Sequence, residues 1–169
     1  MSGLKEVARE CHEAVLANGF EVPTWENFPV KVMLAVTELN EAVAASDEAN
    51  WREEWADFVI RVTGVLEALS GGEWLDRSGT FRYYYERVWT DYISPLECHV
   101  WPALEECCKS VEYWRMGKRV DALMRLEFAV AQAFRIEDMF EFDLVAEMRA
   151  KNEVNKSRGR LHGKKESVG

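Results

Sequence analysis

Residues that interrupt helices are scarce in this chain. Its 169 residues include only 4 Pro and 10 Gly, and no segment shows the apolar–polar alternation of a half-buried strand. Hydrophobic residues make up 48% of the sequence, which is enough to bury one core at this length. The sequence therefore predicts a single all-α domain over residues 1–169.

Long hydrophobic runs are missing as well. No apolar stretch approaches the ~20 residues that a membrane-spanning helix needs, and the opening MSGLKEVARE does not resemble a signal peptide. The cysteines have neither zinc-ligand nor disulfide-framework spacing; they are Cys11, Cys98, Cys107 and Cys108. We therefore expect a cytoplasmic protein with reduced cysteines and no membrane partner.

An overall positive charge is also lacking. The net charge of −9 argues against binding to polymeric nucleic acid. Basic residues are concentrated near the C-terminus, where residues 149–165 hold seven Lys and Arg against the single acid Glu153. A basic segment on an acidic protein indicates a local anionic ligand such as a phosphate chain.

Apolar positions at 3- and 4-residue steps predict a series of helices. They span about residues 4–17, 28–45, 51–70, 79–93, 102–116, 120–134 and 140–156. Thr24 or Asn27 is expected to cap the second helix. Asn50 followed by Glu53 resembles a capping box, which gives Glu53 a structural role at the start of the third helix.

Two pairs of acids interrupt the most apolar of these helices. Glu38 and Glu41 are spaced i, i+3, as are Glu54 and Asp57, so each pair projects from one helix face. If the helices fold back on the polar segment 46–50, Glu38 lies level with Asp57, and Glu41 with Glu54. Four such acids repel one another unless a multivalent cation neutralises them, which favours a metal site over a solvated acidic face.

The residue types at this site favour a hard cation. Carboxylate oxygens suit Mg²⁺ or Mn²⁺, and no Cys/His set competes for zinc. A carboxylate-bridged di-iron bundle needs an ExxH motif on two helices. None of His12, His99 and His162 follows a facing glutamate by three residues, which argues against such an oxidoreductase.

The residues together resemble a known family. The pattern ExxE, twelve intervening residues, then ExxD, in the contexts TELNEA and EEWADF, resembles the signature of MazG-like all-α nucleoside triphosphate pyrophosphohydrolases. The segment KxxxNxxRxxxHGK at 151–164 resembles the tail of short, often phage-encoded members, and ECHEAVLANGF at 10–20 their first helix and turn. Two positions depart from the usual pattern, Thr37 and Asn40.

This resemblance covers roughly residues 8–69 and 140–165 and implies a MazG-like four-helix-bundle core over 4–69 and 136–165. Residues 73–135 would then form an additional helical insert containing a second hairpin. The bundle is completed either by another subunit, as in a homodimer or homotetramer, or by that second hairpin. A phage-encoded member would act in the host cytoplasm.

The resemblance also implies an activity. It is the hydrolysis of a nucleoside triphosphate, preferably a deoxynucleoside triphosphate, to the monophosphate and pyrophosphate. We expect a purine substrate such as dGTP or GTP, whereas dUTP or dCTP hydrolysis stays open as an alternative. From another class, a non-catalytic helical interaction protein is the third interpretation.

Site residues follow from the matching motifs. The expected catalytic and metal-binding residues, around two or more Mg²⁺ or Mn²⁺ ions, are Glu38, Glu41, Glu54 and Asp57. The expected phosphate-binding residues are Lys151, Asn155, Arg158, His162 and Lys164, together with Lys31, which lies two helical turns before Glu38. The candidates for contact with the base are Cys11, His12, Phe20 and Trp25.

Overall fold

The computed structural model describes residues 3–74 and 100–157, and this part of the chain contains helices and no strand. Its six helices are α1 (Leu4–Ala17), α2 (Phe28–Ala44), α3 (Glu48–Ser70), α5 (Val100–Arg115), α6 (Arg119–Phe140) and α7 (Leu144–Ser157). The predicted all-α class is confirmed. The helix expected over 79–93 lies outside the described residues.

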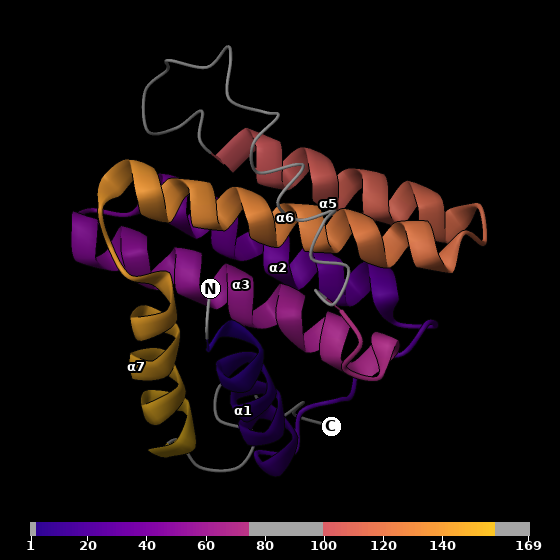
Figure 1. Cartoon of the computed structure of the whole chain (residues 1–169), viewed down its shortest axis with the longest axis horizontal. Helices are drawn as coiled ribbons and strands as arrows, with labels where there is room; N and C mark the ends of the chain where they lie inside the picture. Colours follow the sequence, from indigo (N-terminus) through magenta and orange to yellow (C-terminus); the bar gives the residue numbers. More distant parts are fainter. Residues whose placement is uncertain (1–2, 75–99, 158–169) are drawn as a thin grey trace, which may run out of the picture.

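Two helical hairpins, α2–α3 and α5–α6, pack against each other and form a four-helix bundle (Figure 1). Helix α3 contacts α6, and α2 contacts α5. Residues 100–140 therefore supply two of the four helices, so the bundle closes within one chain. This arrangement is the second of the two ways in which the sequence allowed the bundle to be completed.

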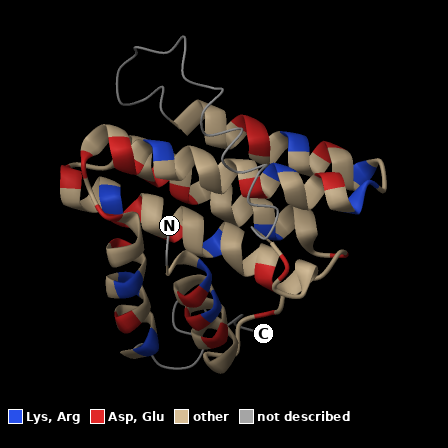
Figure 2. Cartoon of the chain, in the orientation of Figure 1, with Lys and Arg blue, Asp and Glu red and all other residues tan. Residues whose placement is uncertain are grey.

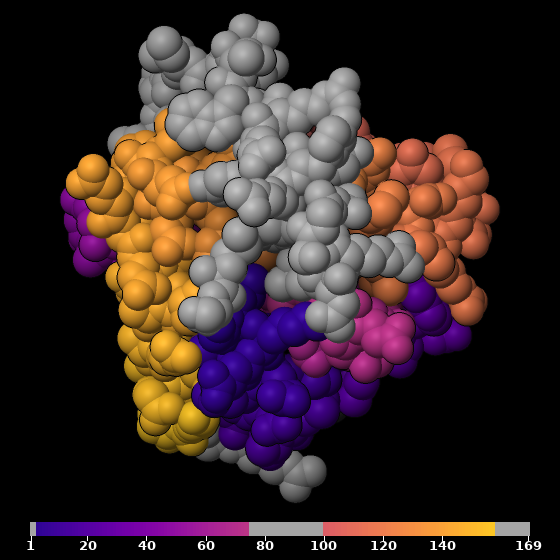
Figure 3. Space-filling view, viewed as in Figure 1, coloured from indigo at the N-terminus to yellow at the C-terminus, as the bar shows by residue number. Residues whose placement is uncertain are grey.

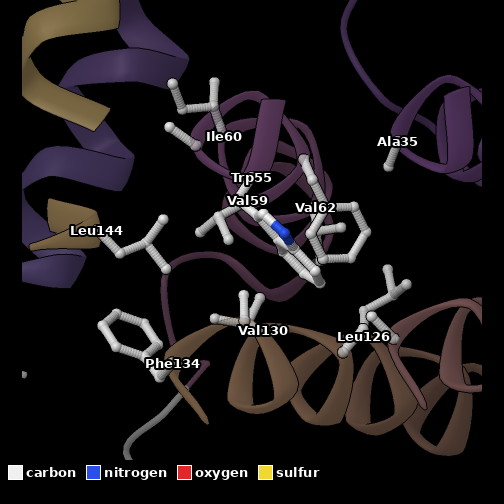
Figure 4. Close-up of a cluster of buried hydrophobic side chains, with 14 of the residues drawn as sticks. Ala35, Trp55, Val59, Ile60, Val62, Leu126, Val130, Phe134 and Leu144 are labelled. Atoms are coloured by element: carbon white, nitrogen blue, oxygen red, sulfur yellow. The ribbon is translucent and has the colours of Figure 1, made fainter. Parts of the chain in front are cut away.

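The core of the bundle is built around Trp55 of α3. In Figure 4 its indole projects toward α6, where Leu126 and Val130 lie. All three side chains are fully buried. Burial of each aliphatic side chain of this kind contributes about 1.5–3 kcal/mol to folding. The interface between the two hairpins is therefore a hydrophobic core and not a surface contact.

Helices α1 and α7 run across the direction of the bundle and pack against α3 and against each other (Figure 1). The space-filling view shows the indigo surface of α1 directly beside the yellow surface of α7 (Figure 3). Leu4 and Val7 of α1 and Leu144 and Met148 of α7 are buried. This packing brings α7, which carries Lys151, next to the helix that carries Glu54 and Asp57.

The observed ends of α1 and α3 can be compared with the capping and stop signals in the sequence. Helix α1 has the predicted bounds, and Gly19 follows it with φ 80°, so that the Phe20 amide donates to the Val15 carbonyl at 3.3 Å. Helix α3 begins earlier than predicted, because Asp47 accepts the Asn50 amide at 2.9 Å. The prediction that Asn50 caps this helix is wrong, and Glu53 lies inside it.

The boundary between α6 and α7 also differs from the prediction. Helix α6 does not end at Phe134 but continues to Phe140, because Ile136 extends its buried face. Glu141 then adopts a left-handed conformation with φ 53° and ends the helix. Helix α7 begins at Leu144 instead of Phe140, and Asp143 accepts the Ala146 amide at 2.9 Å at its start.

The surface and the cysteines complete the description. Acidic and basic residues are interspersed along the helices (Figure 2). Among the described residues, no helix combines the length and the apolar character needed to cross a bilayer. Cys11, Cys107 and Cys108 are free thiols, the first two buried and the third exposed, whereas Cys98 lies outside the described residues.

Candidate functional site

Three carboxylates converge where α2 packs against α3. Glu38 and Glu41 project from α2 and Glu54 from α3, and one carboxylate oxygen of each lies within 4.8 Å of the others. The i, i+3 spacing on α2 and the antiparallel hairpin produce this meeting, as the sequence predicts. Glu38 is 4% exposed, whereas Glu41 is open to solvent.

The electrostatics of this cluster disfavour three full negative charges. Burial raises the pKa of Glu54 to about 7, and the negative charges of Asp57, Glu41 and Glu38 add to the effect. Burial likewise raises the pKa of Glu38. Near pH 7 the Glu54 carboxyl is therefore partly protonated, and a bound cation would compete with its proton.

Asp57, the fourth predicted acid, stands in a different environment. Its carboxylate pairs with the ammonium group of Lys151 on α7 at 2.7 Å, and Lys151 pairs with Glu53 as well. Burial raises the pKa of Asp57, while Lys151 opposes this shift. Three of the four acids therefore form one cluster, and the fourth is held beside it by a lysine that we expect to bind phosphate.

Arg61 is a charged group of this site that the sequence did not reveal. Its guanidinium pairs with Glu38, and its side chain is 43% exposed. Arg61 lies four residues after Asp57, hence on the same face of α3. This spacing was readable in the sequence, but nothing there showed that α2 presents Glu38 to it.

A cleft of about 400 Å³ adjoins the acids, between α1, the segment that follows it, α2, α3 and α7. Its charged and amide side chains include Lys31, Asp57, Arg61, Lys151 and Asn155. Three of the six expected phosphate-binding residues thus line one cavity. The other three, Arg158, His162 and Lys164, lie outside the described residues.

Lys31 and Asn155, like Lys151, already have partners. The Lys31 ammonium donates to the Glu21 carbonyl at 2.9 Å and pairs with the Glu21 carboxylate at 3.2 Å. The backbone carbonyl of Asn155 accepts from the side-chain amide of Asn18 at 2.9 Å, which ties α7 to the end of α1. Asn155 is also one of the residues that line the cleft.

The rest of the cleft is mainly apolar. Its walls include Phe20, Leu34, Ile60 and Val65, with His12 as a polar group. Burial lowers the pKa of His12, which keeps the imidazole neutral at pH 7. This apolar part of the lining suits a flat, uncharged group such as a nucleobase.

The four candidates for base contact therefore divide. His12 and Phe20 line the cleft. Cys11 is buried with its thiol 4.0 Å from the Met148 carbonyl oxygen. Trp25 packs its ring 5.5 Å from that of Phe28. Neither Cys11 nor Trp25 is among the residues that line the cleft.

The acidic cluster can be tested against the geometry of Mg²⁺. Oxygen ligands lie ~2.1 Å from this ion, so two of them are at most ~4.2 Å apart. The cluster oxygens lie within 4.8 Å of one another, a limit slightly beyond this range. The donors are all carboxylate oxygens, the ligand type that Mg²⁺ and Mn²⁺ prefer.

Comparisons with protein-family models, with curated proteins and with solved structures find no match to this chain. The MazG-like resemblance therefore depends on the two sequence motifs. The described geometry adds an acidic cluster and a cleft to them.

Proposed function

We propose that this protein is a MazG-like pyrophosphohydrolase that uses Mg²⁺ or Mn²⁺ to hydrolyse a nucleoside triphosphate to the monophosphate and pyrophosphate. The observation that carries the proposal is that an acidic cluster lies beside a cleft. Carboxylates of Glu38, Glu41 and Glu54 meet within 4.8 Å, and Asp57 and Arg61 connect this cluster to a cleft of about 400 Å³.

The acids would hold the metal ions together with the phosphate chain. Glu38 and Glu41 act from α2, and Glu54 and Asp57 from α3. The bound ions would neutralise phosphate charge and lower the pKa of a water molecule. A carboxylate of the same site accepts the proton of that water.

The other charged residues of the cleft would orient the substrate. Lys151 supplies a positive charge and Asn155 an amide hydrogen-bond donor on the α7 side, while Lys31 stands on the α2 side. Holding the triphosphate and the attacking water in line would lower the entropic cost of bringing the two reactants together. The apolar part of the cleft lining, together with His12, would contact the base.

We propose a purine deoxynucleoside triphosphate such as dGTP, or GTP, as the preferred substrate, with dUTP or dCTP as the alternative of the same class. The setting would be the cytoplasmic nucleotide pool. We also propose a homo-oligomer, although the bundle closes within one chain. Light scattering after size exclusion tests this, because a mass of 19.5 kDa would contradict it.

The decisive experiment is a panel of all canonical NTPs and dNTPs with Mg²⁺ or Mn²⁺, with products resolved by ion-exchange chromatography. Monophosphate and pyrophosphate from one or two substrates would support the proposal and identify the base. Absence of turnover with every nucleotide would contradict it and favour a non-catalytic helical protein.

A further inference from the structure

We propose that Arg61 binds the phosphate chain of the substrate, and that Glu38 holds the Arg61 guanidinium beside the cleft before substrate arrives. The inference rests on the proposed function, since it concerns the same acids and the same cleft. It assigns a substrate-binding role to a residue that lies outside both sequence motifs.

The position of Arg61 carries the first step of the argument. On α3 it follows Asp57 by one turn, about 6 Å along the helix axis. It lines the cleft together with Lys151 of α7, whose ammonium pairs with Asp57. A phosphate chain that extends from the acids into the cleft therefore lies near two cations.

The ion pair leaves most of the guanidinium available. The described contact joins Arg61 Nε to an oxygen of Glu38, and no second ion pair of Arg61 is found within residues 3–74 and 100–157. A guanidinium has five N–H groups, so four remain for other acceptors. Two parallel N–H groups match two oxygens of one phosphate group.

The ion pair with Glu38 determines when the N–H groups of Arg61 would bind phosphate. Glu38 is buried and belongs to the cluster that suits a divalent ion. A cation bound there takes over the Glu38 charge and repels the guanidinium, and a phosphate in the cleft attracts it. Lys151 stands in the same relation to Asp57. Occupation of the acids and binding of phosphate are thereby coupled through Arg61.

Arg61→Gln and Arg61→Lys test this coupling with two ligands. Electron paramagnetic resonance would measure the affinity for Mn²⁺ alone, and calorimetry the binding of inorganic triphosphate at saturating Mg²⁺. We expect Arg61→Gln to weaken triphosphate binding about 10- to 100-fold, the range of a lost charged hydrogen-bond pair. It should bind Mn²⁺ alone at least as tightly as the wild type, because a competing cation has been removed.

The triphosphate affinity of Arg61→Lys should lie between those of the wild type and Arg61→Gln, since lysine keeps the positive charge and lacks the planar guanidinium. The matched control is Arg115→Gln, which removes an exposed arginine paired with Glu112 on α5, away from the cleft. It should change neither affinity. If Arg61→Gln loses the circular dichroism spectrum of the wild type, Arg61→Lys alone carries the test, with an expected weakening of triphosphate binding of about 3- to 10-fold.

Weaker Mn²⁺ binding with unchanged triphosphate binding would overturn the inference, because Arg61 would then only orient Glu38. Unchanged values for both ligands would overturn it as well. Failure of the proposed function is distinguishable: the wild type would then hydrolyse no nucleotide, whatever the two affinities show. Hydrolysis by a wild type whose Arg61 variants bind triphosphate normally would refute the role of Arg61 alone.

Discussion

The two hairpins of the bundle differ in how acidic side chains are grouped and paired. In α5–α6, Glu106 pairs with Lys109 at 3.0 Å and with Arg125 at 3.2 Å, and Glu112 pairs with Arg115 at 2.9 Å. These partners all come from the same hairpin. In α2–α3, Glu38 also pairs with Arg61 of its own hairpin, but it shares its cluster with Glu41 and Glu54, and the Asp57 charge is met by a lysine of α7.

This difference distinguishes the hairpin that we propose as a scaffold from the hairpin that carries the proposed site. Exposed ion pairs within one hairpin contribute little to stability, and their charges are neutralised without a bound ligand. Three acids that share one cluster with a single arginine partner raise the free energy of the folded protein, and a sequence selected only for stability would not keep them. For this reason our proposal places the function at the acids of α2–α3.

The largest expected difference between the two hairpins appears when one acid in each is neutralised. Glu41→Gln should lower nucleotide turnover by at least about 10³-fold, since it removes a ligand of a preorganised site. Glu112→Gln in α5 should leave turnover unchanged. Initial rates with Mg²⁺ measure both, and near-wild-type activity of Glu41→Gln would refute the metal assignment. Asp57→Asn should reproduce the loss.

The scaffold role of α5–α6 is tested by its core. Leu126→Ala should reduce the free energy of unfolding by about 2–5 kcal/mol, because Leu126 is fully buried against α3. Chemical denaturation measures this change. A loss below about 1 kcal/mol would mean that α5–α6 is an appendage and not half of the bundle. The exposed Val120 offers a control, and Val120→Ala should have little effect.

Stabilisation by a bound metal ion should depend on the acids of α2–α3 and not on those of α5–α6. Mn²⁺ or Mg²⁺ at ~100 times its dissociation constant should stabilise the fold by about 2.7 kcal/mol, seen as a rise in Tm. The rise should disappear in Glu41→Gln and persist in Glu112→Gln. An equal rise in both variants would place cation binding elsewhere in the protein.

The smallest expected effect is a pH dependence without metal. The pKa of Glu54 is raised in the folded protein from 4.5 to about 7, so the folded state binds more protons than the unfolded state between these values. Its contribution to stability is therefore full below about pH 4.5 and is lost as the pH rises to about 7. Denaturation of the wild type and of Glu54→Gln should show a difference that changes over this window and is constant above it. A difference that grows in the opposite direction would contradict the assignment.

Local patterns in the sequence predicted much of this structure. The bounds of α1, its glycine stop and the meeting of Glu38, Glu41 and Glu54 depend on helix periodicity and on one tight turn between neighbouring helices. Such features depend on residues close in sequence, where spacing alone constrains geometry.

Other features depend on contacts that spacing does not determine. The pairing of Lys151 with Asp57 requires α7 to lie along α3, and the Arg61–Glu38 pair requires the rotation of α2 relative to α3. The start of α3 was misassigned because Asp47 and Asn50 are both good capping residues, and only the backbone chooses between them. The roles of the acids, the metal and the substrate remain predictions.

The closure of the bundle within one polypeptide has a consequence for how this protein can change. Where two identical hairpins pair across a symmetry axis, every substitution occurs twice, once on each side. Here the second hairpin has its own codons, and a substitution in α5 or α6 is not copied into α2 or α3. The stoichiometry is then one acidic cluster per chain in any assembly, and the face opposite the acids can be redesigned without altering them.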